Sequence, residues 1–495
     1  MDSGDNSSNL GVSDGKTKQT WNETNLIHAI CSLCSYIGKL LYWKRKSIPG
    51  PVPLPFVGSL WRYLMQPVKD VEHDLIMEHG PLMGMMEGAS PVLLVSDPRL
   101  VDEIFVRKFS VFSDNKNYFF HRIIVQGLST INGAGWRRQR KIIGPAFTQF
   151  KLRPLVPRIQ SCLLRLQQHL DRQIGGQDSA TVDMKDVMNT FMIDVVSRIL
   201  FAVDGDPYSP DSVFAAQVKQ LTKIPISKLI AFTSFPVFLL EWMEFNLYPD
   251  GPSNFLIRLL ESVVKERKES NERVDDFIDL LLHAHSDDGA GLSEGEVMGN
   301  MMQFFMAGFD TTSGTLSAAC HSLAVHPEIQ ERLRSEMEET DYTLTDASKD
   351  SFLNAFIQEV LRMYPHAVRI DRVSNANITL TLNGKEVTID AGTRVRLPIY
   401  HMNHDADTFQ DPEQFDPDRF MTGGRSCDKR IYTFAAGSRN CVGENFARLV
   451  IRMTLTHLMK HFQILRSDRT TDQLDFSSSN ILLHAKSNFI TLKKV

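Results

Sequence analysis

Apolar residues recur at three- and four-residue spacing along much of this chain, a pattern that predicts a mainly helical protein. The longest helix is expected to run from about residue 293 to residue 325. Ser293 and Glu296 have the spacing of a capping box at its start, and Pro327 follows its end. At 1.5 Å per residue this helix would be roughly 50 Å long and would cross the whole body.

Two stretches depart from the helical pattern and predict short strands. Residues 92–96 form an apolar run that is typical of a buried strand. Residues 378–389 alternate apolar and polar side chains around Asn383 and Gly384, a strong signal for a two-residue hairpin. Since no Ser/Gly-rich linker divides the chain after residue 56, we expect one mainly α body with a small β subdomain.

The N-terminal segment differs in composition from the rest. Residues 1–25 are polar and rich in Ser, Asn, Asp and Gly, which predicts disorder. Residues 26–48 are predicted to be a membrane anchor with a basic stop, although the apolar run is short and contains polar residues. A proline-rich hinge begins at residue 49, so residues 49–495 are assigned to one catalytic domain. The positive-inside rule places this domain in the cytosol.

Residues 224–247 form an unusually apolar and aromatic segment that is interrupted by Pro225 and Pro236. Such a segment belongs either to the core or to a surface that dips into a membrane. Of the two interpretations we favour a lipid-facing entrance for substrate. Its aromatic residues are Phe232, Phe235, Phe238, Trp242 and Phe245.

Charge and cysteine usage narrow the possible functions. The formal net charge of −5 shows no basic excess of the kind that nucleic-acid binding requires. The six cysteines are too widely scattered for a disulfide framework, so a reducing compartment is expected. Cys31 and Cys34 form a C-x-x-C without a second ligand pair, which argues against a zinc site.

The segment Phe434–Gly443 carries the most specific chemical signal. Cys441 lies just before a predicted amphipathic helix that starts near Glu444, where backbone N–H groups and the helix dipole favour a thiolate, the form that binds metals. Gly437 and Gly443 would let the backbone lie close to a flat group, and Arg439 could meet an acid on it. The alternative is a buried structural cysteine.

A polar group interrupts the middle of the long predicted helix. Asp310 and Thr311 follow Ala307-Gly308, and these residue types compete for backbone hydrogen bonds, so we expect a local distortion there. A polar surface face is the alternative. The apolar neighbours argue against it, because they are of the kind expected in a core: Met301, Phe304, Phe305 and Phe309.

Two further pairs share a helix face. Trp136 and Arg140 are four apart and can both donate to one carboxylate. Glu359 and Arg362 are three apart, but an E-x-x-R arises about once by chance in a chain of this length. The basic residues beside Trp136 could steer an acidic partner, and they are Arg137, Arg138 and Lys141.

The pattern F-x-x-G-x-R-x-C-x-G around Cys441 is the cysteine-ligand loop of the haem-thiolate enzymes, and this chain resembles a cytochrome P-450 from about residue 49 to residue 494. The resemblance implies haem b between the long helix and the Cys441 loop, with Cys441 as axial ligand in a loop that includes Phe434 and Gly437. It implies propionate contacts from Trp136, Arg140, Arg372 and Arg439.

By the same resemblance, Thr311 and Asp310 organise proton delivery during oxygen activation, with Asp310 connecting Thr311 to solvent. Glu359, Arg362 and Arg419 form a structural network near the cysteine loop. Substrate would contact an apolar pocket formed by Phe119, Phe304, Ala307, Ile370 and Ile481.

Residues 361–365 and 369–372 are most similar to the animal clan of drug- and steroid-oxidising microsomal members, which includes thromboxane synthase. The resemblance implies dioxygen and a lipid, steroid or xenobiotic as substrates, and the cytosolic face of the endoplasmic reticulum membrane. It implies electrons from an NADPH-cytochrome reductase, with cytochrome b5 as a second donor. Thr433 departs from the proline that many members have there.

Two other functions are compatible with a haem-thiolate loop. One is an isomerase or dehydratase that rearranges a lipid peroxide without external electrons; Asp310 and Thr311 argue against it, because that reaction needs no proton delivery to dioxygen. The other is a haem-binding protein without catalysis, which only the same acid and alcohol disfavour.

Overall fold

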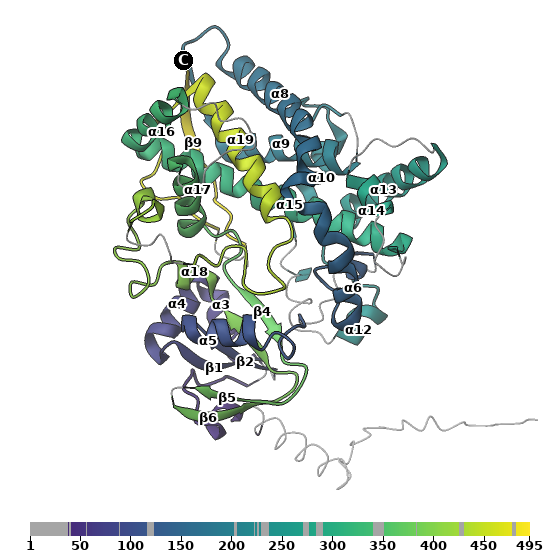
Figure 1. Cartoon of the computed structure of the whole chain (residues 1–495), viewed down its shortest axis with the longest axis vertical. Helices are drawn as coiled ribbons and strands as arrows, with labels where there is room; N and C mark the ends of the chain where they lie inside the picture. Colours follow the sequence, from purple (N-terminus) through teal and green to yellow (C-terminus); the bar gives the residue numbers. More distant parts are fainter. Residues whose placement is uncertain are drawn as a thin grey trace, which may run out of the picture.

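The computed structural model places most of the chain in a helical body with a smaller β subdomain at one end (Figure 1). This confirms the predicted fold class. The residues that the structure describes are 38, 41–55, 57–88, 90–115, 123–201, 205–221, 223–224, 227–228, 237–270, 277–283, 291–339, 351–382, 384–424, 430–477 and 482–495.

The β subdomain is built on a four-stranded sheet of order β1-β2-β7-β4. Its strands are β1 (Leu82–Glu87), β2 (Ser90–Val95), β7 (Arg394–Leu397) and β4 (Ile370–Val373). β2 and β7 run parallel and the other pairs are antiparallel. The helices of this part are α2 (Tyr42–Arg45), α3 (Trp61–Met65), α4 (Val68–His79), α5 (Pro98–Asp102), α18 (Ile399–Asn403) and the π-helical turn η1 (Glu103–Arg107).

A hairpin of β5 (Ile378–Leu382) and β6 (Lys385–Ile389) lies beside this sheet (Figure 1). Leu382 pairs with Lys385 across a two-residue loop, as predicted, although Asn383 lies outside the described residues. Gly384 has a φ of 76°, a left-handed conformation that favours glycine in such loops.

The helical body surrounds α15 (Glu294–Val325), which packs against α9, α17, α19 and β8. The neighbouring helices are α6 (Gly133–Ile143), α7 (Gln149–Leu152), α8 (Val156–Ile174), α9 (Met184–Val196), α10 (Val213–Leu221), α12 (Val237–Trp242), α13 (Asp250–Ser270), α14 (Phe277–Leu282), α16 (Pro327–Glu339), α17 (Phe352–Met363) and α19 (Glu444–His461). Shorter turns are η2 (Ile124–Gln126), η3 (Gly144–Phe147), η4 (Arg153–Leu155), η5 (Ser197–Phe201) and η6 (Pro417–Phe420).

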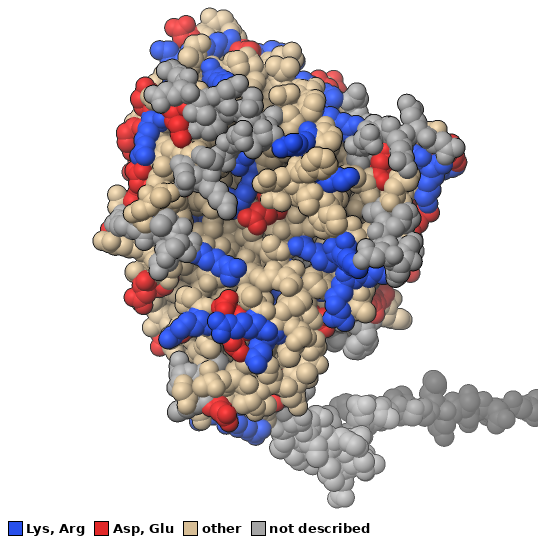
Figure 2. Space-filling model, viewed as in Figure 1, with Lys and Arg blue, Asp and Glu red and all other residues tan. Residues whose placement is uncertain are grey.

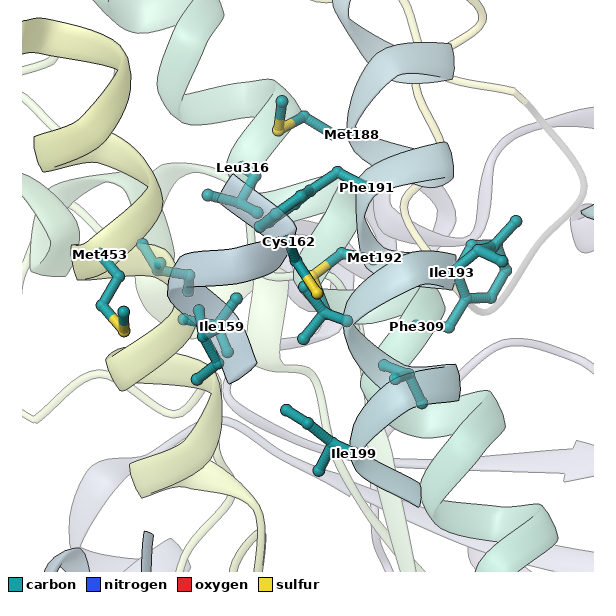
Figure 3. Packing of buried hydrophobic residues seen from close by; sticks show 14 of the residues in the cluster. Ile159, Cys162, Met188, Phe191, Met192, Ile193, Ile199, Phe309, Leu316 and Met453 are labelled. Carbon is teal, nitrogen blue, oxygen red and sulfur yellow. The ribbon is translucent and has the colours of Figure 1, made fainter. Parts of the chain in front are cut away.

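A third sheet closes the far end of the body with the antiparallel order β3-β9-β8. Its strands are β3 (Ser179–Asp183), β9 (Phe489–Lys494) and β8 (Phe462–Arg466). The main core lies between α8, α9, α15 and α19, where apolar side chains of all four helices meet (Figure 3). Its members include Cys162, Phe191, Met192, Leu316 and Met453.

The central helix starts and ends where the sequence predicts. Ser293 Oγ accepts a hydrogen bond from Glu296 N at 3.3 Å, and Glu296 Oε2 accepts one from Ser293 N at 2.8 Å. This capping box satisfies two N–H groups that the first turn leaves without helical partners. The helix ends at Val325, with His326 as its C-cap just before Pro327.

The last residues of the predicted anchor pack on the β subdomain. Trp43 is only 4% exposed, and its Nε1 donates to Met85 O at 2.8 Å. A Cβ on Gly84 would lie 2.2 Å from the indole, so a residue without a side chain is needed beneath it. Residues 1–37 lie outside the described residues, and within the described part no helix is long and apolar enough to cross a bilayer.

The aromatic segment 224–247 is described only in part. Leu240 and Leu247 are buried in the body, whereas the side chain of Trp242 is 80% exposed and Met243 is half exposed. The segment therefore contributes to both core and surface. Phe232 and Phe235 lie outside the described residues.

Candidate functional site

The cysteine loop lies between the helical body and the β subdomain, immediately before α19 (Figure 1). Cys441 N donates to Phe434 O at 2.9 Å, and Asn440 N donates to Gly437 O at 3.0 Å. These two backbone hydrogen bonds close the loop. α19 then begins at Glu444 with Gly443 as its N-cap. The geometry places the Cys441 side chain two residues before a helix N-terminus, as predicted.

The glycines of the loop differ in what they approach. Gly437 has a φ of 74°, and a Cβ there would lie 1.9 Å from Phe105 O of η1. Glycine is therefore required at residue 437 by a close contact with the protein backbone. The approach of this loop to a flat group stays a prediction. A Cβ on Gly443 would lie 4.0 Å from Cys441 Sγ, in ordinary van der Waals contact.

The Cys441 thiol is accessible, although the chain is packed closely around it. Burial raises the pKa of this thiol above its usual value, while the N–H groups of Gly443 and Glu444 and the charge of Arg140 act in the opposite direction. The helix N-terminus alone therefore does not produce the expected thiolate. A bound metal cation would supply the missing charge, because it deprotonates a coordinating thiol directly.

One face of α15 opens at the middle of the helix. Ala307 is exposed and Gly308 and Thr311 are half-buried, whereas most other residues of α15 are buried. A Cβ on Gly308 would lie 3.7 Å from Val196 of α9 and 4.0 Å from Phe446 of α19, so both helices border this part of α15. The arrangement leaves accessible surface on a helix that otherwise crosses a core.

The expected distortion of α15 is absent. The helix runs unbroken from Glu294 to Val325. The threonine hydroxyls fit into it because they donate hydrogen bonds to backbone carbonyls four residues earlier in the same helix. Thr311 Oγ1 donates to Ala307 O at 2.6 Å, and Thr315 Oγ1 donates to Thr311 O at 3.0 Å. Such i−4 bonds satisfy a threonine within an α-helix.

Asp310 contacts two histidines that the sequence analysis did not identify. His484 Nε2 lies 2.9 Å from Asp310 Oδ2, and His366 Nε2 lies 3.7 Å from the same oxygen. Burial raises the pKa of Asp310, but the two histidines outweigh that effect and hold it well below its usual range. Asp310 therefore contacts His484 directly, and its side chain is 19% exposed. The connection of Thr311 to solvent through Asp310 stays a prediction.

No sequence pattern pointed to these histidines. His366 follows Pro365, and His484 lies 174 residues after Asp310 in the C-terminal segment. Their approach depends on tertiary folding, since α17 and the C-terminal segment both pass beside α15.

Three arginines meet beside the cysteine loop. Arg140 Nη2 donates to Asn440 Oδ1 at 2.8 Å, which ties α6 to the loop. Arg372 Nη2 donates to Arg439 O at 3.3 Å, and Arg372 Nη1 donates to Asn115 Oδ1 at 3.0 Å. Arg439 Nη2 donates to Ile131 O at 2.7 Å. All of these partners are neutral oxygens.

Within the described residues, no ion pair compensates the charges of these arginines, although Asp371 and Asp114 act on Arg372 and Arg439 from nearby. Burial lowers the pKa of Arg372 to about 10 and that of Arg439 to about 9, and the neighbouring Arg372 adds to the effect on Arg439. Among the residues that the structure describes, none of Arg140, Arg372 and Arg439 forms an ion pair with a carboxylate. Arg439 Nε is buried and lacks a hydrogen bond in the described protein.

Aromatic rings support this cationic group. Trp136 is buried on α6, and the Arg439 guanidinium lies 4.5 Å from the centre of its ring. Arg448 similarly lies 5.1 Å from the ring centre of Phe434. Flat cations are held against ring faces in this way. Trp136, Arg140, Arg372 and Arg439 are thus brought together around the loop.

The residues Glu359, Arg362 and Arg419 lie together behind the loop and are completely buried. Arg362 Nε contacts Glu359 Oε2 at 2.7 Å, and Arg419 Nε contacts Glu359 Oε1 at 3.1 Å. Thr433 Oγ1 donates to Leu361 O at 2.6 Å, which joins the helix of this network to the segment preceding Phe434. The three charged groups face one another and not an open space.

The predicted pocket residues are only partly placed. Ala307 lies on the open face of α15, and Ile370 is half-buried at the start of β4. Phe304 is half-buried, with its ring centre 5.2 Å from Phe147 and 5.5 Å from Phe277. Phe119 and Ile481 lie outside the described residues.

The basic residues of α6 do not act alike. Arg138 forms an ion pair with Glu296 and donates to Gly291 O at 3.0 Å, so it connects α6 with the start of α15. Figure 2 shows Lys and Arg side chains gathered over the region of α6 on one face of the molecule. Arg137 is exposed on that helix.

These observations fit the predicted haem. An accessible thiol, an accessible helix face opposite it and buried arginines without carboxylates are the features that a flat, doubly acidic iron cofactor requires. The orphaned Nε of Arg439 is a donor that such an acid would satisfy.

Known proteins are similar to this chain over most of its length. The Cytochrome P450 family matches residues 48–492. Cytochrome P450 3A11 of Mus musculus is 30% identical over 467 residues, which cover 89% of this chain and 90% of the relative. Cytochrome P450 3A40 of Oryzias latipes is 27% identical over 469 residues, which cover 90% of this chain and 91% of the relative. The chain therefore belongs to the cytochrome P450 family, the oxidoreductases that hold haem through a cysteine and act as monooxygenases.

Proposed function

We propose that this protein is a haem b monooxygenase that inserts one atom of dioxygen into a small apolar substrate, while the other atom leaves as water. The observation that carries the proposal is the group of buried arginines beside an accessible cysteine. Arg140, Arg372 and Arg439 would hold the two propionates by charge-assisted hydrogen bonds. The haem iron supplies oxygen activation when it is bound.

Cys441 is the proposed axial ligand. The hydrogen bond from its backbone N–H to Phe434 O closes the loop that carries it. This bond limits how far the sulfur can move. Arg140 and the N–H groups of Gly443 and Glu444 stabilise negative charge on the sulfur. Trp136 keeps Arg439 in position by its ring face.

Thr311 and Asp310 are proposed to move protons toward the open face of α15. The Thr311 hydroxyl can both donate and accept, so rotation away from Ala307 O would let it hold a water molecule. Asp310 is held ionised and accepts a hydrogen bond from His484. Protons would therefore reach Thr311 through His484 and Asp310.

The substrate is proposed to be a lipid, steroid or xenobiotic. Ala307 presents a small apolar side chain on the open face, and Phe304 and Ile370 add apolar surface nearby in the predicted pocket. Phe119 and Ile481 complete the proposed lining.

External partners are part of the proposal. An NADPH-cytochrome reductase, with cytochrome b5 as a second donor, would dock through acidic residues on the basic region over α6 (Figure 2). We further propose that residues 26–48 attach the protein to the cytosolic face of the endoplasmic reticulum membrane.

The first test is the carbon monoxide difference spectrum of the dithionite-reduced protein beside Cys441→Ala. We expect the red-shifted Soret band of a thiolate-ligated haem in the parent protein and its loss in the variant. A spectrum that is indifferent to Cys441 would contradict the proposed ligand. Reconstitution with a reductase then tests oxygen insertion, and NADPH-independent turnover of a lipid hydroperoxide would favour an isomerase instead.

A further inference from the structure

Asp310, His366 and His484 form a compact three-residue cluster on the side of α15. Each offers one ligand atom, and the three atoms lie within 4.8 Å of one another. They come from three distant segments: the middle of α15, the chain after α17, and the segment before β9. Their ring and carboxylate groups therefore meet only in the folded chain. The two imidazole ring centres are 5.1 Å apart.

The hydrogen bond between Asp310 and His484 accounts for only part of this cluster. His366 is 5% exposed, and its Nε2 has no hydrogen-bond partner in the described protein. That nitrogen lies 3.7 Å from Asp310 Oδ2, which is too long for a hydrogen bond. A buried polar atom pointing at a carboxylate without bonding to it suggests that a third group belongs between them.

The backbone of α15 is shaped to admit His366. A Cβ on Gly314 would lie 2.6 Å from His366 Nδ1 and 2.8 Å from His366 Cε1. Gly314 follows Asp310 by four residues, so both lie on the same face of the helix. The absence of a side chain at residue 314 is what brings the imidazole within reach of Asp310.

Two imidazoles and a carboxylate are ligands that suit borderline transition-metal ions. Zinc binds histidine nitrogen at about 2.0–2.1 Å and carboxylate oxygen at about 2.0–2.2 Å, so neighbouring ligand atoms of a tetrahedral site lie roughly 3.3 Å apart. The observed separations from Asp310 Oδ2 are 2.9 Å and 3.7 Å, one on either side of this value. Magnesium and calcium prefer all-oxygen sites, which argues against them here.

We propose that Asp310, His366 and His484 form a binding site for a divalent transition-metal ion of the zinc class. The ion would replace the Asp310–His484 hydrogen bond and give His366 Nε2 its missing partner. One coordination position would remain for water, since three protein ligands leave a tetrahedral ion incomplete. This site is distinct from the iron site at Cys441.

Metal binding has a consequence that rests on the proposed function. A carboxylate bound to zinc no longer accepts a proton from His484, so Thr311 loses its proposed proton supply. Zinc would then slow reductase-supported turnover and leave the Cys441 thiolate in place. Binding and inhibition are separate measurements, which allows either hypothesis to fail alone.

The test is zinc binding by the full-length haem-loaded protein, prepared without a histidine tag and freed of metal by a chelator. Competition with a chromophoric zinc indicator should reveal one site per chain that is tighter than any other. His484→Gln is the principal variant because this side chain is the most exposed of the three. We expect it to weaken binding at least about tenfold, as loss of even an indirect metal contact commonly does.

The matched control is a double variant, His457→Gln with His461→Gln. These two rings lie 4.6 Å apart on α19 and also form a histidine pair, but without a carboxylate among their ligand atoms. The control should keep the tight site. Its loss in the control, or equal zinc binding by the parent and His484→Gln, overturns the proposal.

His366→Gln should also weaken the site. The carbon monoxide spectrum reports whether it folds, and if it does not, His484→Gln decides the question alone. Tight zinc binding by a protein that shows no turnover would support the metal site and contradict the proposed function. Turnover without tight zinc binding would do the reverse.

Discussion

Buried arginines occur in two parts of this protein, and their surroundings are opposite. In the β subdomain, Arg396 lies 2.8 Å from Asp371 and 2.7 Å from Glu87, and Arg369 lies 2.8 Å from Glu72. Beside the cysteine loop, Arg140, Arg372 and Arg439 donate hydrogen bonds to amide and backbone oxygens, and to no carboxylate among the described residues. The arginines of the first group are neutralised by carboxylates of the protein, whereas those of the second group can still pair with an acidic ligand.

The pKa values express the same difference. Burial lowers the pKa of Arg396, but Asp371 and Glu87 more than reverse this and hold it well above its usual value. Burial lowers the pKa of Arg372 to about 10, and the nearby charge of Asp371 offsets this only in part. A buried cation without an acid is costly for folding, so its presence indicates a binding role and not a stabilising one.

Two neighbouring residues of strand β4 belong to these two different groups. Asp371 faces Arg396, its register partner on β7, while Arg372 contacts the backbone of Arg439 in the cysteine loop. Alternation along a strand sends neighbouring side chains to opposite faces. The sheet therefore carries a closed ion network on one face and a ligand-directed cation on the other.

The largest expected effect is from Arg396→Met. Removing this cation leaves Asp371 and Glu87 with uncompensated buried charge, so the free energy of unfolding should fall by about 3–5 kcal/mol. Urea unfolding measures the change. Arg466→Met, which removes an exposed ion pair with Asp472, should cost about 1 kcal/mol or less. Equal effects of the two substitutions would contradict the importance of burial.

Gly437→Ala tests how firmly the loop that presents Arg439 is held. The added Cβ would meet Phe105 O and the residue would keep a φ of 74°, so we expect a loss of roughly 2–3 kcal/mol in stability. Gly423→Ala is the matched control: its φ is 80°, but a Cβ there meets nothing within 4 Å. It should cost only about 1 kcal/mol by thermal unfolding. A loss of stability in Gly437→Ala no larger than that in Gly423→Ala would mean that η1 can move away from the added Cβ at little cost.

Arg439→Gln should separate ligand binding from folding. The substitution removes a donor of a charge-assisted bond, worth about 1.5–3 kcal/mol, so haem should transfer to an acceptor protein roughly ten to a hundred times faster. Urea unfolding of the haem-free protein should change little, because no ion pair within the described protein is lost. A large loss of apoprotein stability with unchanged haem transfer would place Arg439 with the structural arginines instead.

The smallest effect concerns His404, a buried base that has no carboxylate partner among the described residues. Burial lowers its pKa to about 3, against 6.5 for the ordinary side chain, although Nδ1–H donation to Tyr400 O acts in the opposite direction. Between these values the unfolded chain binds a proton that the folded chain does not. Stability from this residue is therefore complete above about pH 6.5 and is lost as pH falls, by roughly 1.4 kcal/mol per pH unit.

Comparison of urea unfolding at pH 7 and pH 5.5 measures this slope. His404→Gln should make this slope less steep, because the variant lacks the group that only the unfolded chain protonates in this range. An unchanged slope in His404→Gln would mean that other groups govern the acid sensitivity of the fold.

Local signals were enough to locate the main elements of the site. Ser293, Glu296 and Pro327 define the ends of α15 because caps and prolines act within one helical turn. Phe434–Gly443 identifies the cysteine loop because its glycines, arginine and cysteine act within ten residues. The predicted distortion at Asp310 and Thr311 was wrong, because the threonine hydroxyls bond to the helix itself.

The pairing of distant charges was not predictable. Glu72, Glu87, Asp371 and Arg396 are separated by up to 324 residues, and His366 and His484 reach Asp310 from different segments. Which arginine receives a carboxylate and which remains open depends on sheet order and strand alternation. These charge pairs are therefore known only from the folded structure, because no sequence motif specifies them.

The amino-acid sequence alone determined the family of this protein, its central helix and the loop that contains the proposed ligand Cys441, since each depends on residues close together in the chain. Tertiary structure decided the electrostatics of the site: which cations are compensated, that the Cys441 thiol is not ionised by its helix alone, and that Asp310 meets two histidines. Charge interactions depend on distance and burial in space, and sequence separation specifies neither.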